Sequence, residues 1–278
     1  MRILLSNDDG VFAPGLTVLE EIARSVSDDI WIVAPHEEQS GQARAITLNA
    51  PVRVREEGPK RYAVQGTPAD AVLLGVKDIL ANHPPDLILS GVNRGQNIAE
   101  DTSQSGTVAA AIEGMHLGIP SIAFSQARNF RRGEPIPWET GRVWGPRVLK
   151  ALLKSGWPKN CVMNVNFPDR LPQDVAGVEV TSQGFRDEAI STLEKRTDLR
   201  GADYFWIGYS SKPSKPDEGT DLRAIYEGRV SVTPLHIDMT HHAYRAELAK
   251  SFRVADAGGA KTRAFGRRGL CWRCASLA

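Results

Sequence analysis

Two adjacent aspartates, Asp8 and Asp9, follow the first apolar run of the chain. Residues 1–16 read MRILLSNDDGVFAPGL, so the apolar residues 3–5 end in a polar turn that contains glycine. Two neighbouring carboxylates repel each other unless water or a cation compensates them. A divalent cation would do so, which makes the pair a candidate metal site. A solvated turn is the alternative, because Asn, Asp and Gly all favour turns.

Ser105, Gly106 and Thr107 stand where a helix of small residues, 108–117, is expected to begin. The first backbone N–H groups of a helix lack helical partners, and the helix dipole favours an anion there. The glycine allows close approach and the two hydroxyls add donors, so the stretch is typical of a phosphate site. The alternative is an ordinary N-cap by Ser105.

Further oxygen-bearing side chains follow two other expected strands. Ser40 and Gly41 come after the second strand, and Asn93 and Asn97 come after the third. Carboxylate, hydroxyl and amide oxygens suit a hard cation such as Mg²⁺ or Mn²⁺. The chain has no clustered His and Cys residues for zinc, no P-loop, no G-x-G-x-x-G after a strand and no G-x-S-x-G nucleophile elbow.

The elements that would position these residues alternate between strands and helices. The expected strands are residues 3–5, 30–34, 86–90, 121–125 and 161–167, and the expected helices are residues 15–25, 67–81, 108–117 and 138–153. Unbroken apolar strands are typical of a parallel sheet covered on both faces. Residues 45–64 predict an antiparallel excursion. Ligands bind beyond the carboxyl ends of parallel strands, so we expect the three loops to converge.

The pattern changes after residue 171. Residues 178–181, 204–209 and 229–235 predict strands, and we expect them to form β-hairpins attached to the α/β core. The chain is therefore divided into a core, 1–170, an extension, 171–252, and a tail, 253–278. The tail is rich in Gly, Ala and Arg without periodicity and is expected to be disordered. Its Cys271-x-x-Cys274 is a weak zinc signal, because it lacks a second ligand pair.

Composition excludes several classes of protein. The 278 residues are 41% hydrophobic and 24% charged, as in ordinary globular proteins. Net charge is +1, but residues 254–278 carry five basic residues against Asp256, which leaves the first 253 residues at −3. A weak nucleic-acid contact by the tail is the most this charge favours. Three cysteines, no signal-peptide core and no apolar run of about 18 residues predict a cytoplasmic protein without a membrane partner.

The sequence resembles the SurE family, the survival protein E type 5'/3'-nucleotidases, over roughly residues 1–250. The stretches that carry the resemblance occur in order along the chain. They are R-I-L-L-S-N-D-D-G, the A-P-x-x-x-Q-S-G type segment 34–41, S-G-V-N-R-G-Q-N (90–97), S-G-T-V-A-A-A (105–111) and the segment 220–235 that ends in V-S-V-T-P-L. Each is modest alone, and the ordered set is specific.

The resemblance implies a Rossmann-like, three-layer parallel-sheet core with a β-hairpin-rich extension that forms homodimers or homotetramers. It implies release of phosphate from nucleoside 5'- and 3'-monophosphates, and from short polyphosphate in some members. One divalent cation per subunit, Mg²⁺ or Mn²⁺, would polarise the phosphoryl group. The family's metal ligands fall on Asp8, Asp9, Ser40 and Asn93, and the two aspartates are also the catalytic candidates. Its phosphate contacts fall on Asn7, Gly41, Asn97, Ser105, Gly106 and Thr107.

Two other functions compete with a metal-dependent nucleotidase. A haloacid-dehalogenase-type phosphatase would have D-x-D after the first strand, whereas Asp8 and Asp9 are adjacent. A non-catalytic nucleotide- or RNA-binding stress factor would use a basic surface interleaved with aromatic residues, which the acidic core does not provide. Gln104 stands where the family often has Tyr, a departure that bears on any ring contact there.

Overall fold

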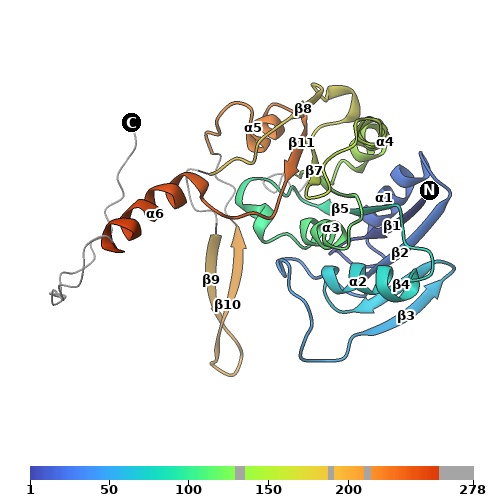
Figure 1. Cartoon of the computed structure of the whole chain (residues 1–278). Coiled ribbons are helices and arrows are strands. Elements are labelled where there is room, and N and C mark those ends of the chain that lie inside the picture. Colours follow the sequence, from blue (N-terminus) through green and yellow to red (C-terminus); the bar gives the residue numbers. More distant parts are fainter. Residues whose placement is uncertain (129–134, 187–190, 210–213, 257–278) are drawn as a thin grey trace. The chain divides into compact units, whose positions relative to one another are not determined.

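The structure is a computed structural model of the chain and describes residues 1–128, 135–186, 191–209 and 214–256 (Figure 1). The chain divides into two compact units, Met1–Ile237 and Asp238–Ala278. In the second unit, the described residues include helix α6, His242–Asp256. None of the helices in the described ranges is long and apolar enough to cross a membrane.

A nine-stranded sheet dominates the first unit, with the order β3-β4-β2-β1-β5-β6-β7-β11-β8 (Figure 1). The strands are β1 Arg2–Ser6, β2 Asp29–Pro35, β3 Arg53–Gly58, β4 Arg61–Gln65, β5 Leu87–Arg94, β6 Ser121–Gln126, β7 Val162–Phe167, β8 Val178–Val180 and β11 Val230–Leu235. Neighbouring strands from β4 to β7 pair in parallel, whereas β3 is antiparallel to β4 and β11 is antiparallel to β7. The sheet confirms the predicted α/β fold class.

Helices cover both faces of this sheet. They are α1 Pro14–Arg24, α2 Pro68–Leu74, α3 Gly106–His116, α4 Trp138–Ser155 and the short α5 Asp221–Tyr226, with a π-helical turn at Gly75–Ile79 and 3₁₀ turns at Ala99–Ser103 and Pro172–Asp174. Residues of α1 and α4 pack into one apolar cluster, and residues of α2 and α3 pack into two others. Because the sheet lies between these clusters, the core has the three predicted layers.

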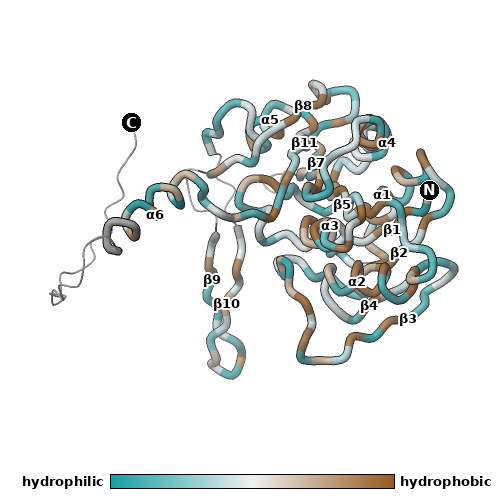
Figure 2. Tube along the Cα trace, viewed as in Figure 1, coloured by the Kyte–Doolittle hydropathy of each residue, from teal (hydrophilic) through white to brown (hydrophobic). Residues whose placement is uncertain are grey.

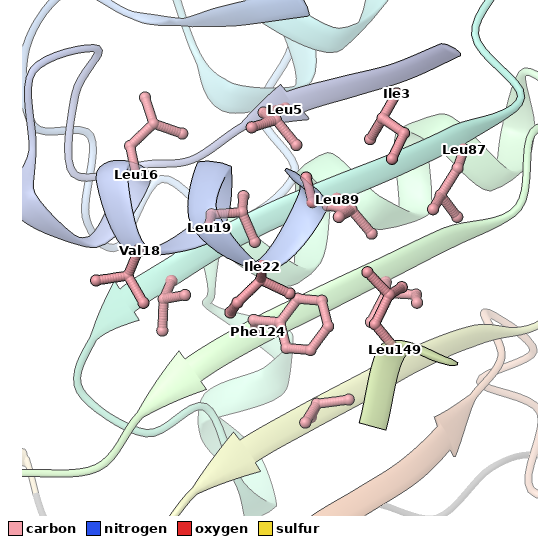
Figure 3. Packing of buried hydrophobic residues seen from close by; sticks show 14 of the residues in the cluster. Ile3, Leu5, Leu16, Val18, Leu19, Ile22, Leu87, Leu89, Phe124 and Leu149 are labelled. Atoms are coloured by element: carbon pink, nitrogen blue, oxygen red, sulfur yellow. The ribbon is translucent and has the colours of Figure 1, made fainter. Parts of the chain in front are cut away.

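Successive residues of the central strands point to opposite faces of the sheet, and both faces are covered by apolar clusters, so the strands are unbroken apolar runs in the sequence. On β1, Ile3 and Leu5 join the cluster of α1, whereas Leu4 joins the cluster of α2, and all three are fully buried. Figure 3 shows the first of these clusters, where α1 presents Leu19 and Ile22 to the strands. Figure 2 shows the hydrophobic residues gathered along these inner elements. Burial on both faces is the mark of a parallel sheet.

The C-terminal part agrees with the expectation only in part. Strands β9, Ser191–Thr197, and β10, Asp203–Tyr209, form a hairpin as a separate two-stranded sheet, in which β10 was predicted and β9 was not. Strands β8 and β11, however, do not form a hairpin, because they join the main sheet beside β7. The sequence patterns also missed α5 and α6. Helix α6 ends four residues into the segment predicted to be disordered, and residues 257–278, with both tail cysteines, lie outside the described residues.

Candidate active site

The predicted site residues lie where the strand order of the sheet reverses. Strand β1 pairs with β2 on one side and with β5 on the other, so the chain leaves β1 toward one edge of the sheet, to β2, and leaves β5 toward the opposite edge, to β6. Asp8 and Asp9 follow β1, Ser40 and Gly41 follow β2, and Asn93 lies near the end of β5. In doubly wound sheets this switch point, beyond the carboxyl ends of the strands, is where ligands bind. The predicted third loop is shorter than expected, because β5 continues to residue 94.

Backbone hydrogen bonds hold these loops against one another. The N–H of Gln39 donates to the carbonyl of Asp8 at 2.7 Å, which fixes the loop after β2 to the aspartates. Four residues later, the N–H of Ala43 donates to the carbonyl of Gln104 at 3.1 Å, just before α3. The two predicted residues between these contacts are therefore held between the aspartate loop and the start of α3.

Helix α3 begins directly against Asp8, whose residue surface is only 3% exposed. The hydroxyl of Thr107 donates to Oδ1 of Asp8 at 2.5 Å. A Cβ on Gly106 would lie 2.7 Å from the Cβ of Asp8 and 2.9 Å from its Oδ2, closer than carbon atoms pack, so only glycine fits. Ser105 is the N-cap of the helix, and its Oγ accepts from the N–H of Val108 at 3.1 Å. The predicted cap and the predicted close approach therefore occur together.

The folded chain holds the two carboxylates at an electrostatic cost. Burial, followed by the charge of Asp9, raises the pKa of Asp8 from 3.8 to about 6. Burial also raises the pKa of Asp9, against the lowering effects of the Arg94 backbone N–H and guanidinium. Both shifts show that the surrounding groups under-compensate the negative charge. A cation between the carboxylates would supply what is missing.

The solvent side of Asp9 carries charged residues that the sequence patterns did not single out. Arg94 donates its backbone N–H to Oδ2 of Asp9 at 3.0 Å, and its Nη2 lies 3.4 Å and 3.5 Å from the two carboxylate oxygens of Glu38. Burial and then the charge of Arg94 lower the pKa of Arg128, while Asp9 and Glu38 raise it. Arg94 stands inside the S-G-V-N-R-G-Q-N stretch, which was the available signal for it. Arg128 follows β6 without any local pattern.

Two of the predicted metal ligands are oriented by neighbouring groups. The hydroxyl of Ser40 donates to Oε1 of Glu38 at 2.9 Å, on the exposed side of the loop. The amide nitrogen of half-buried Asn93 donates to the carbonyl of Gly95 at 2.8 Å. That bond fixes the amide plane and leaves Oδ1 of Asn93 as a neutral oxygen donor.

Asn97 is held by strands β6 and β7. Its backbone N–H donates to Oδ1 of Asn166 at 2.8 Å, and its side-chain amide donates to the hydroxyl of Ser125 at 2.8 Å. Its carbonyl accepts from the amides of Asn164 and Asn166 at 2.8 Å and 3.1 Å. The alternation of Asn164 and Asn166 in the apolar strand C-V-M-N-V-N-F was a signal for this polar support that sequence reasoning passed over.

Asn7 occupies a different position from the other predicted phosphate contacts. It is buried, and its amide nitrogen donates to the carbonyl of Gly10 at 2.8 Å while its Oδ1 accepts from the N–H of Gly10 at 3.3 Å. Both polar groups of the side chain therefore close the loop that carries the aspartates. A phosphate contact by Asn7 stays a prediction.

A distant part of the chain positions the turn before α3. Arg186 pairs with Glu100 at 3.0 Å and with Asp101 at 2.7 Å, and its side chain is only 9% exposed. Asp221, which is fully buried, accepts from the N–H of Ala99 at 3.0 Å. Arg186 and Asp221 thus hold the 3₁₀ turn that links Asn97 to the helix start.

The fold and the site define a doubly wound α/β protein with an acidic, oxygen-lined site opposite a helix N-terminus. The sequence profile described as Survival protein SurE matches residues 3–189, and the chain belongs to this family. A protein of Hyphomonas neptunium named 5'-nucleotidase SurE is 62% identical over 253 residues, which are 91% of this chain and 100% of that protein. A protein of the same name from Azorhizobium caulinodans is 52% identical, with the same two coverages.

A solved structure has the same fold. The crystal structure of SurE protein from Aquifex aeolicus matches 92% of this chain and 100% of its own, with a TM-score of 0.76 and 38% sequence identity.

Proposed function

We propose that this chain is a divalent-cation-dependent nucleotidase that releases phosphate from nucleoside 5'-monophosphates and also from 3'-monophosphates. The observation that carries the proposal is the pair of buried Asp8 and half-buried Asp9, with Asp8 packed against the start of α3. Relatives of more than 50% identity over most of the chain bear the name 5'-nucleotidase SurE, which supports the reaction class. Short polyphosphate is a further candidate substrate.

The donor set fits one Mg²⁺ or Mn²⁺ ion per subunit. Asp8 and Asp9 would hold the cation through carboxylates, and Ser40 and Asn93 through neutral oxygens. In the described residues no three or more His, Cys, Asp or Glu side chains are grouped so that they could hold a metal ion. Mg²⁺ usually keeps several waters and binds through one or two carboxylates. When bound, the cation polarises the phosphoryl oxygens and offsets their charge.

The chain's own residues bind and orient the phosphate. The first N–H groups of α3, including that of Thr107, and the hydroxyl of Ser105 would donate to its oxygens, while the hydroxyl of Thr107 donates to Asp8. Gly106 allows the substrate to approach the helix backbone, and Gly41 approaches from the facing loop. Asn97, fixed by β6 and β7, would add a side-chain contact. These groups are positioned before substrate arrives, so little reorganisation accompanies the reaction.

Phosphate release tests the proposal directly. A panel of nucleoside 5'- and 3'-monophosphates and short polyphosphate is assayed with Mg²⁺, with Mn²⁺ and with chelator. Release that depends on the cation, and that Asp9→Asn abolishes while the circular dichroism spectrum stays unchanged, is the expected result. Asp28→Asn, at an exposed aspartate outside the site, is the matched control and should keep full activity. Full activity of Asp9→Asn, or release in chelator, contradicts the proposal.

We further propose that residues 171–252 mediate a homodimer or homotetramer of a cytoplasmic protein. Exposed apolar side chains on the β9–β10 hairpin support an interface there: Leu193, Tyr204, Phe205, Trp206 and Ile207. Light scattering of the natural chain and of a Phe205→Ser/Trp206→Ser variant measures the state. A monomeric natural chain, or a variant of unchanged mass, would count against this role of the hairpin.

A further inference from the structure

Arg94 contributes to the site through two separate groups. Its backbone N–H donates to Oδ2 of Asp9 at 3.0 Å and so fixes the predicted metal ligand. Its guanidinium extends away from this bond to Glu38, on the loop that also carries Ser40. The backbone contact does not depend on which side chain stands at position 94. A substitution there therefore changes the guanidinium alone.

The ion pair between Arg94 and Glu38 is easy to break. Nη2 of Arg94 lies 3.4 Å and 3.5 Å from the two oxygens of Glu38, which is long for a charge-assisted hydrogen bond. The two side chains are 48% and 53% exposed, so solvent screens their attraction. Exposed pairs of this kind contribute little to stability. Glu38 therefore holds the guanidinium of Arg94 only weakly, so the guanidinium can leave Glu38 for another anion.

The guanidinium of Arg128 lies near that of Arg94. Arg128 follows β6, whose register sets Gln126 beside Arg94 on β5. It is close enough to interact with Arg94, Asp9 and Glu38 at once, and it is half-buried. Two like charges side by side favour an anion between or above them, and a phosphate dianion satisfies two guanidinium groups better than the single charge of Glu38.

We propose that Arg94 is a phosphate-binding residue of this site, which exchanges its contact with Glu38 for oxygens of the substrate phosphate next to Arg128. The inference rests on the proposed function, and it identifies Glu38 as a competitor for the guanidinium. Substrate binding then breaks only a weak exposed pair and forms a stronger, geometrically matched one. The aspartates hold the cation, α3 holds one side of the phosphate, and the arginines hold the side that faces solvent.

Calorimetric titration of inorganic phosphate into the Mg²⁺-containing protein tests this exchange. Arg94→Gln should weaken phosphate binding about 10- to 100-fold, because it removes a charged hydrogen-bonding partner. Glu38→Gln should tighten binding by up to about fivefold, because it frees the guanidinium. In the double variant the effect of Glu38→Gln should shrink to the part that its contacts with Ser40 and Arg128 carry, since its main route is through Arg94. Arg94→Lys should bind phosphate more weakly than the natural chain and more tightly than Arg94→Gln.

Arg223→Gln is the matched control, because Arg223 on α5 has a side chain that is 42% exposed and pairs with Glu227, just after that helix and outside the site. It should leave the phosphate affinity unchanged. The inference is overturned if Arg94→Gln binds phosphate within about twofold of the natural chain, if Glu38→Gln weakens binding, or if the natural chain binds no phosphate. The titration needs no turnover, so a chain that binds phosphate through Arg94 but hydrolyses no nucleotide would contradict the proposed function alone.

Discussion

Replacing Asp8 by Asn is expected to stabilise the metal-free chain while it abolishes activity. Asp8 is 3% exposed, and burial, with the neighbouring Asp9, raises its pKa from 3.8 to about 6. One pKa unit corresponds to about 1.4 kcal/mol, and the pKa of Asp8 is raised by about two units. The ionised side chain therefore lowers the free energy of unfolding by about 3 kcal/mol. Asn cannot ionise, and its Oδ1 can still accept the hydroxyl of Thr107.

The sign of the effect gives it a distinctive pH dependence. A raised carboxyl pKa means that the folded chain binds more protons than the unfolded chain between 3.8 and about 6. The stability of the natural chain therefore falls as pH rises through this window, and the contribution of Asp8 stays unfavourable above it. The Asn variant lacks this dependence. Its advantage over the natural chain should grow by roughly 1 kcal/mol between about pH 5 and about pH 8.

Urea unfolding of chelator-treated protein at the two pH values measures the difference in free energy. Asp29→Asn is an informative comparison of opposite sign, because hydrogen bonds from Lys60 and then Arg2 lower the pKa of Asp29 to about 2. That variant should be less stable than the natural chain at neutral pH, by an amount that disappears as pH falls below 3.8 toward about 2. The reasoning is refuted if Asp8→Asn is the less stable protein at about pH 8, or if its advantage is the same at both pH values.

Three further predictions concern the groups that shape the site. Gly106→Ala should lower the free energy of unfolding measured in urea by about 1–3 kcal/mol and reduce turnover, because its Cβ would overlap Asp8. The control is Gly141→Ala on α4, whose Cβ would lie at least 3.4 Å from other atoms and which should be neutral or stabilising. Equal effects of the two substitutions would contradict the role of the close approach. The Arg186→Gln protein should unfold at a lower temperature, and its KM should rise more than its kcat falls, because the two carboxylate partners of Arg186 lie on the 3₁₀ turn Ala99–Ser103 that precedes α3. An unchanged KM would speak against this. A chain cut after Asp256 should keep phosphate release, since the Hyphomonas neptunium relative matches this chain over 253 residues that make up 100% of its own length. Loss of activity in a truncated chain that still folds would disprove this.

The parallel core was predictable because its strands are buried on both faces. Ile3, Leu4 and Leu5 are all fully buried, so the local sequence alone shows an apolar run between polar turns. Strand β9 reads S-T-L-E-K-R-T and has a single large apolar residue, so it carries no apolar face that a pattern could detect. Helix α6 does place Tyr244, Leu248 and Phe252 four residues apart, a helical spacing that sequence reasoning passed over. The placement of β11 beside β7 depends on pairing between distant residues, such as Val232 with Val165, which no local window contains.

The candidate site was predictable only as far as it follows strand ends. Asp8 and Asp9 stand directly after a buried strand, and Ser105 begins a helix of small residues, so both could be placed at one sheet edge. Arg186 could not, because it comes from a segment without periodicity, and Arg128 follows the predicted strand β6 but has no motif around it that singles it out. Their partners lie far away in sequence, as with Arg186 and Asp101, which are 85 residues apart.

The cost of the aspartate pair explains why so much of the structure is committed to holding it. Asp8 cannot turn toward water, because its carbonyl accepts from Gln39, its carboxylate accepts from Thr107 and Gly106 packs against its Cβ. The rigid, two-faced core beneath β1 prevents the loop from relaxing as a whole. A flexible loop would relieve the repulsion by separating the carboxylates, and it would then bind a cation weakly. Because the chain cannot separate them, protonation or a cation would relieve the repulsion, so the feature that raises the pKa of Asp8 is the one that would give the proposed metal site its affinity.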